Sequence, residues 1–171
     1  SKLTHRLLSH ALSLHAYSKV TTIIALDNVL DAIEGRAISV VRDPGRYFLT
    51  IYGDPASPPW AWQFEGHHVC LNFTLGADGI VSATPLFLGS NPAEIAHGGR
   101  PIVRVCGEEE DAGRDLLRSL GAFEQARAII CKVAPPDFVL MNSPRVPERM
   151  RTGDAPALGP IAAEFAKLSD E

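Results

Sequence analysis

The sequence predicts an α+β protein in which an antiparallel meander of about four strands is covered by helices. Apolar residues recur at helical spacing over residues 1–35. Residues 38–88 instead alternate apolar and polar side chains between short turn sequences, which is typical of an antiparallel sheet. Helices are predicted again over residues 91–131, and an extended, proline-rich arm with a short helix over residues 135–171. We therefore expect a single domain, or an incomplete part of one.

Composition and charge exclude several classes of function. The 171 residues are 46% hydrophobic and 21% charged, as in a soluble globular protein with a substantial core. The net charge of −4 gives no basic footprint for nucleic acid, and no apolar run approaches the roughly 20 residues of a membrane span. Three distant cysteines form neither a disulfide framework nor a zinc ribbon. The sequence does not identify the cellular compartment of the protein. It begins at Ser1 without methionine, so export with removal of a targeting segment is one alternative.

The helical segment at the amino terminus carries an acidic group near its end. Two helices are predicted, over residues 3–16 and 17–33, and Gly35 is a plausible stop for the second. The acidic side chains Asp27, Asp31 and Glu34 are interpreted as a face that points to solvent.

The stretch Pro58–Thr74, with the sequence PPWAWQFEGHHVCLNFT, has the densest alternation of apolar and polar residues. Its apolar phase changes between Phe64 and Val69. One extra residue at Gly66, a β-bulge, would restore a continuous apolar face, because glycine tolerates the backbone of a bulge. A tight turn at residues 65–66, which would make a hairpin, explains the phase change equally well.

Under the bulge interpretation, a polar stripe on this strand gathers candidate ligands. It contains Gln63, His68, Cys70 and Asn72, with Glu65 close by. His67 would then lie at the edge of the apolar layer. An imidazole, a carboxylate and an amide on one sheet face can bind a metal ion or transfer a proton. The alternative is an ordinary half-buried sheet whose second face meets water or a covering helix.

Two further segments supply candidates. Asn91 and Pro92 are typical of a helix start, and the turn that contains Ser90 and Asn91 has backbone N–H groups that can hold an anion; ordinary helix capping is the alternative. The acidic run at residues 108–111 opens a predicted helix, where the helix dipole favours it. The sharper hypothesis gives Glu109 a role as a metal ligand or base opposite His68.

Three segments together resemble a known family: WAWQFEGHHVCLNFT, TPLFLGSNPAE and EEEDAGRDLLRSL are similar to the domain-of-unknown-function family numbered 3500. The resemblance covers about Tyr17 to Pro136, and it implies no activity, because the family is uncharacterised. It implies that members are longer than this chain, with another strand segment beyond Glu171 that contains two closely spaced histidines. Serine is expected in the family motif where this chain has Cys70, which argues against a required Cys70 thiolate.

Three functions follow from these candidates, and the sequence does not decide whether the protein is an enzyme. The first is a metal-dependent enzyme whose divalent metal ion is bound by His68, His67 and a carboxylate of Glu65 or Glu109, and whose site is completed by a second chain. The second is a small-molecule site; its candidate residues are Trp60, Trp62, Gln63, Asn72, Ser90 and Asn91. The third is a structural or assembly subunit in which the motif specifies the fold. The helix-start signal at the end of the chain also predicts a partner chain or oligomer that completes the fold.

Overall fold

The computed structural model describes residues 1–35 and 41–129. Its contacts divide the chain into two units, Ser1–Glu110 and Asp111–Glu171, which are treated separately. No helix in the described part of the chain is long and apolar enough to cross a membrane. The start of the predicted sheet region, residues 38–40, and the whole proline-rich arm from residue 135 lie outside the described residues.

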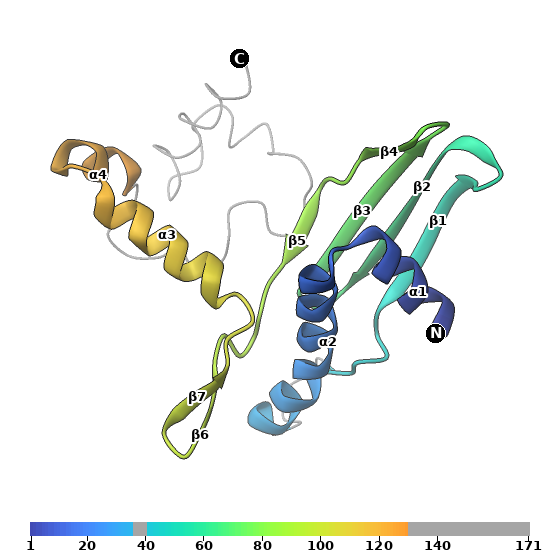
Figure 1. Ribbon diagram of the computed structural model, residues 1–171. Coiled ribbons are helices and arrows are strands. Elements are labelled where there is room, and N and C mark those ends of the chain that lie inside the picture. Colours follow the sequence, from blue (N-terminus) through green and yellow to red (C-terminus); the bar gives the residue numbers. More distant parts are fainter. Residues whose placement is uncertain (36–40, 130–171) are drawn as a thin grey trace, which may run out of the picture. The chain divides into compact units, whose positions relative to one another are not determined.

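Two helices open the first unit (Figure 1). Helix α1 spans Lys2–Ala11 and helix α2 spans Leu14–Glu34. Each begins at a serine whose hydroxyl accepts a backbone N–H of the first turn, Ser1 from Thr4 and Ser13 from Ala16. Helix α2 ends at Gly35, which has φ 68° in the left-handed region. The predicted stop at Gly35 is therefore confirmed.

An antiparallel sheet follows, as predicted. Its strands are β1 (Phe48–Asp54), β2 (Ser57–Gly66), β3 (Val69–Gly76), β4 (Gly79–Ser82) and β5 (Leu86–Leu88). The first four form a meander in the order β1-β2-β3-β4, and β5 also pairs with β3. The end of the predicted sheet region, residues 79–88, divides into two short strands on either side of Pro85, which cannot donate to a ladder hydrogen bond.

The register of β2 and β3 decides between the bulge and the hairpin. Trp62 pairs with Phe73, Phe64 with Leu71, and Gly66 with Val69, so the chain reverses through a two-residue turn, His67–His68. The bulge interpretation is wrong, and the hairpin interpretation is right in kind, with its turn two residues later than expected. His68 has φ 63°, as the second central residue of a type II turn requires.

One face of the sheet forms the core with α1 and α2 (Figure 1). The strands contribute five buried side chains, and the helices add four more: Trp62, Phe64, Val69, Leu71, Phe73, Leu8, Val20, Ile23 and Leu26. The ring of Trp62 stacks on that of Phe73 at 4.4 Å. Burying each such side chain stabilises the fold by roughly 1.5–3 kcal/mol, so this layer fixes the hairpin against α2.

The described part of the predicted helical segment 91–131, residues 91–129, is only partly helical. The predicted short helix after Asn91 is wrong, because the segment forms a hairpin of β6 (Ile95–His97) and β7 (Arg100–Val103). Gly98 and Gly99 both have positive φ and make its turn. Helices α3 (Gly107–Ser119) and α4 (Ala122–Ala128) confirm the remaining helical predictions.

Candidate functional site

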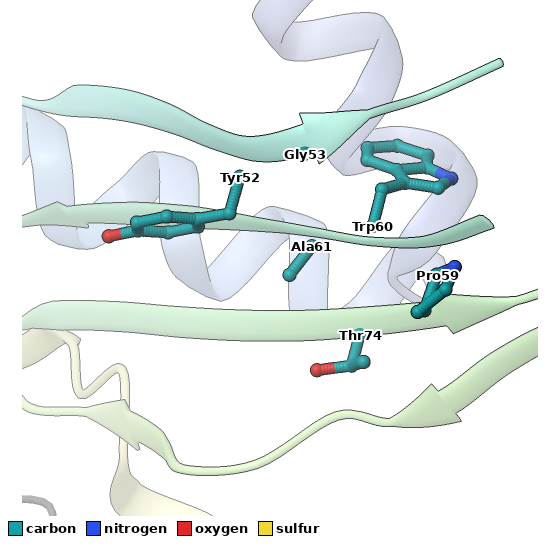
Figure 2. Close-up of a pocket in the computed structure, with 6 residues that line it drawn as sticks. All are labelled: Tyr52, Gly53, Pro59, Trp60, Ala61 and Thr74. Atoms are coloured by element: carbon teal, nitrogen blue, oxygen red, sulfur yellow. The ribbon is translucent and has the colours of Figure 1, made fainter. Parts of the chain in front are cut away.

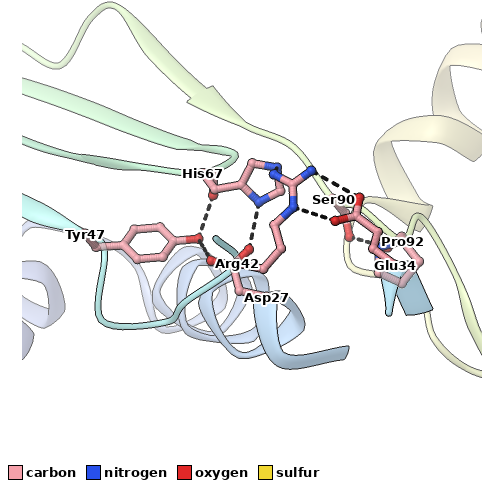
Figure 3. A network of polar contacts seen from close by, with 7 residues as sticks. All are labelled: Asp27, Glu34, Arg42, Tyr47, His67, Ser90 and Pro92. Carbon is pink, nitrogen blue, oxygen red and sulfur yellow. Dashed lines mark hydrogen bonds and ion pairs between the residues drawn. The ribbon is translucent and has the colours of Figure 1, made fainter. Parts of the chain in front are cut away.

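The His67–His68 turn meets helix α2 at a buried carboxylate (Figure 3). Asp27 is 2% exposed, and its Oδ1 lies 2.7 Å from His67 Nδ1. The Tyr47 hydroxyl lies 2.9 Å from Asp27 Oδ2 and 2.6 Å from the carbonyl oxygen of His67, so its single proton is shared between two acceptors. The prediction that Asp27 belongs to a solvated face is wrong: this side chain fastens α2 to the β2–β3 hairpin.

Arg42 extends the network on the other side of the imidazole. Its NH1 lies 3.2 Å from His67 Nε2, and its Nε and NH2 donate to the two carboxylate oxygens of Glu34 at 2.9 and 3.1 Å. Because a guanidinium only donates, Nε2 must accept, and the ring proton then sits on Nδ1 and is donated to Asp27. His67 is thereby fixed in one tautomer. Glu34, also expected to be solvated, is instead held by a bidentate ion pair.

These contacts shift the pKa values of three groups. The hydrogen bond from Arg42 lowers the pKa of Glu34, and the same bond raises the pKa of Arg42. Burial, followed by the hydrogen bond to Asp27, raises the pKa of the Tyr47 phenol. Tyr47 therefore stays protonated throughout the physiological range and acts as a donor only.

His68 has a different environment from that of its neighbour. Its ring centroid lies 4.0 Å from that of His67, and the ring meets Phe87 edge-on at 6.5 Å. Its Nδ1 is buried and has no hydrogen-bond partner in the described part of the chain. Burial, followed by the electrostatic influence of the neighbouring His67 ring, lowers the pKa of this imidazole. A neutral ring with an unused nitrogen, next to a histidine backed by a carboxylate, is the chemically distinctive feature of the turn.

The low pKa of His68 predicts how stability depends on pH. The unfolded chain binds a proton at His68 near the ordinary pKa of about 6.5, whereas the folded chain resists protonation. The contribution of His68 to stability is therefore fully present above about pH 6.5 and is lost as the pH falls from there toward the folded-state pKa. We expect His68→Gln to flatten the decline in unfolding free energy below pH 6.5, measured by urea titration. An unchanged slope would contradict this, and His97→Gln, in the exposed β6–β7 hairpin, is the control.

The polar stripe exists, but His68 is not part of it. Gln63 accepts from the Tyr52 hydroxyl at 2.9 Å and donates to Glu65 at 2.8 Å. Asn72 donates to the carbonyl oxygen of Pro85 at 2.7 Å and contacts the sulfur of Cys70 at 3.4 Å. These residues lie on the sheet face opposite the core. His68 does not share that face, because it occupies a turn rather than a strand position.

The two tryptophans do not form one pocket wall. Trp62 is 2% exposed and belongs to the core. Trp60 is half-buried and borders a hollow of about 280 Å³ (Figure 2). The hollow is lined by Tyr52, Gly53, Pro59, Trp60, Ala61 and Thr74. Because this volume is below that of sites for drug-sized ligands, about 300–1,000 Å³, the hollow supports no assignment.

The remaining candidate ligand residues differ in how close they lie to the His67–His68 turn. The carbonyl oxygen of His68 accepts from the backbone N–H of Gly89 at 2.8 Å, which places the segment before Ser90 and Asn91 beside the turn. The Ser90 hydroxyl itself donates to the carbonyl oxygen of Pro92. Glu109 pairs with Lys19 and takes no part in the network around Asp27. Within residues 1–35 and 41–129, no group of three or more His, Cys, Asp or Glu side chains could hold a metal ion.

Sequence reasoning missed the four residues that surround His67: Asp27, Glu34, Arg42 and Tyr47. One signal could have found the first of them. Asp27 follows Ile23 by four positions and precedes Leu30 by three, so it occupies the apolar stripe of α2. A carboxylate in such a stripe requires a buried partner.

Comparison with known proteins gives a family without a described activity. A family model described as "Protein of unknown function (DUF3500)" matches residues 1–165. No curated protein and no solved structure matches the chain.

Proposed function

The chain belongs to the DUF3500 family of proteins of unknown function, and from that premise we propose that the His67–His68 turn binds a divalent transition-metal ion. The observation that carries the proposal is the 2.7 Å contact between the buried Asp27 carboxylate and His67 Nδ1. Histidines that bind metal ions commonly donate their second ring N–H to a carboxylate, which fixes the tautomer and raises the basicity of the free nitrogen. His67 Nε2 is the nitrogen so prepared.

His68 supplies the second donor. Its ring lies 4.0 Å from that of His67, so two imidazoles from one turn lie close enough to share an ion after a small rotation of the rings. The lowered pKa keeps the ring neutral near pH 7, which is the form that binds a metal. Two imidazoles are fewer than the three or four protein ligands of zinc sites. The remaining ligands in this proposal come from outside the described residues, from a second chain or from the substrate.

Arg42 has to move away from His67 Nε2 when the metal ion binds. Its NH1 donates to the lone pair of His67 Nε2 that a metal would use. Because its Nε and NH2 are held by Glu34, NH1 leaves the imidazole only if the Arg42–Glu34 ion pair shifts as a unit. Metal binding then exchanges one hydrogen bond for a coordinate bond, and Asp27 keeps its contact with Nδ1.

A structural role for the turn is the second candidate, and a specific observation favours it. Both ring nitrogens of His67, both oxygens of Asp27 and the Tyr47 hydroxyl already have partners. A network in which every group has a partner needs no ligand, and its role can be simply to hold the hairpin against α2. In that case His67 and Asp27 matter for folding, and His68 binds nothing.

Metal analysis of the purified full chain distinguishes the two candidates. We expect about one zinc or copper ion per chain after loading and desalting, and loss of that ion in His68→Ala. His97→Ala is the matched control, because His97 is exposed in the β6–β7 hairpin. Circular dichroism checks that each variant is folded. No ion above background in the wild type, or equal metal content in all three proteins, would refute metal binding and leave the structural role.

A further inference from the structure

Strand β1 forms one edge of the main sheet among the residues that the structure describes. It lies at the end of the order β1-β2-β3-β4, and within the described residues its outer side pairs with no other strand. Its sequence FLTIYGD contains no proline, and its only charged residue is Asp54 at the end. Unpaired backbone N–H and C=O groups along such a strand are a template for another strand.

The side chains of β1 are unusually apolar for an exposed edge. Phe48 is 60% exposed, Ile51 50% and Tyr52 52%. According to the register, Ile51 lies on the core side of the sheet, opposite Trp62, whereas Phe48 and Tyr52 lie on the outer side. A partner strand would therefore cover apolar surface on both faces at once.

The opposite edge of the sheet is protected. There β4 and β5 are only four and three residues long, and Pro85 interrupts the edge between them. Short edge strands and a proline are devices that prevent edge-to-edge pairing. The contrast between the two edges indicates that pairing through β1 would stop at two copies and would not continue into a fibre.

The chemistry of β1 is symmetric about its third residue. Read in either direction from Thr50, the strand has an aliphatic and then an aromatic side chain, Leu49 and Phe48 on one side and Ile51 and Tyr52 on the other. We propose that β1 pairs antiparallel with β1 of a second copy, with the two-fold axis between the two Thr50 residues.

In this register every side chain meets one of its own kind. Phe48 faces the partner's Tyr52, Leu49 faces the partner's Ile51, and the two threonines face each other. Aromatic pairs, aliphatic pairs and opposed threonines are among the stabilising cross-strand combinations. A two-fold axis requires a surface that complements itself, and this strand satisfies that condition over its first five residues.

A charge placed on the axis tests the pairing. Thr50 is exposed, so Thr50→Lys leaves the isolated fold intact but sets two lysines opposite each other in the dimer. We expect self-association, measured by sedimentation equilibrium and by light scattering on the full chain, to weaken on the order of tenfold. Thr74→Lys is the matched control: Thr74 is exposed on the same sheet face, but it belongs to β3, which is paired on both sides.

A charge swap makes the test specific for the two-fold axis. Thr50→Glu alone is expected to weaken self-association as Thr50→Lys does. An equimolar mixture of the two variants is expected to restore it, because lysine then faces glutamate. The proposal is overturned if the wild type is monomeric at every accessible concentration, if both threonine sites respond alike, or if the mixture remains as dissociated as its components. A strand from elsewhere in the chain that occupies the edge would appear as the first of these results.

Discussion

Asp27→Ala is expected to lower the free energy of unfolding by about 3–5 kcal/mol, because it leaves buried hydrogen-bond donors without an acceptor and opens a cavity. The Nδ1–H of His67 would lose its only acceptor, and the Tyr47 hydroxyl would keep only the carbonyl oxygen of His67. An unsatisfied buried donor costs about 1–3 kcal/mol, and a cavity where the carboxylate stood adds to this. Since typical domains are stable by only 5–15 kcal/mol, the variant should be close to unfolded at moderate temperature.

Urea unfolding followed by tryptophan fluorescence measures this loss, since Trp62 is in the core. A chelator in the buffer keeps metal binding out of the comparison. Asp27→Asn should lose less than Asp27→Ala, because an amide oxygen can still accept one of the two hydrogen bonds. Asp78→Asn, in the exposed turn before β4, should stay within about 0.5 kcal/mol of the wild type. A loss below about 1 kcal/mol in Asp27→Ala would mean that the carboxylate does not hold the hairpin.

The strands could be predicted from the sequence because period-two alternation is a local property. The place where the chain reverses could not. Two-residue hairpin turns usually contain Asn-Gly or a similar pair of residues, whereas this turn consists of two histidines. His68 adopts positive φ without being glycine, whereas Gly66, two residues earlier, is the residue in this stretch whose type suggests a turn or bulge. Alternation alone therefore left bulge and hairpin equally acceptable, and the pairing of β2 with β3 had to decide.

The candidate site shows a second limit. The stretch that holds the two histidines could be singled out from its composition, but the partners of His67 lie far away in the sequence, 40 residues back for Asp27 and 25 for Arg42. Charged residues on helices are usually solvated, so the acidic group of α2 was assigned to solvent. That assignment is wrong for Asp27, because the helix face that carries Asp27 packs against the hairpin and buries its side chain. Only the position of Asp27 within the apolar stripe carried the information.

The hairpin after Asn91 shows that local signals can serve two structures. Asn followed by Pro suits a helix start, and it equally suits a turn. Two successive glycines end helices, and they also make tight hairpin turns. Here the Gly98–Gly99 pair forms the turn between β6 and β7. The choice depends on the pairing of the flanking residues, which short segments do not reveal.

Gly66→Ala is expected to destabilise the protein by about 3 kcal/mol, through steric overlap rather than backbone strain. A Cβ at this position would lie 2.4 Å from the Tyr47 ring. The ring cannot move aside cheaply, because it stacks on Phe64 at 5.9 Å and its hydroxyl is bonded to Asp27 and to the carbonyl of His67. Gly113→Ala, in helix α3, makes the same chemical change. An added Cβ at Gly113 would meet no atom within 4 Å outside its own helix backbone, so this variant should be neutral or stabilising.

A double-mutant cycle identifies the cause of the loss. In a Tyr47→Ala background the ring is absent, so the added methyl group meets open space, and Gly66→Ala should cost less than about 0.5 kcal/mol. The coupling between the two positions would then be more than 2 kcal/mol, at the upper end for residues in direct contact. Thermal unfolding of the four proteins, followed by circular dichroism, gives the cycle. If Gly66→Ala costs the same with and without the Tyr47 ring, steric overlap with that ring is not the cause of the loss. Glycine would then be required at position 66 for the backbone of the hairpin.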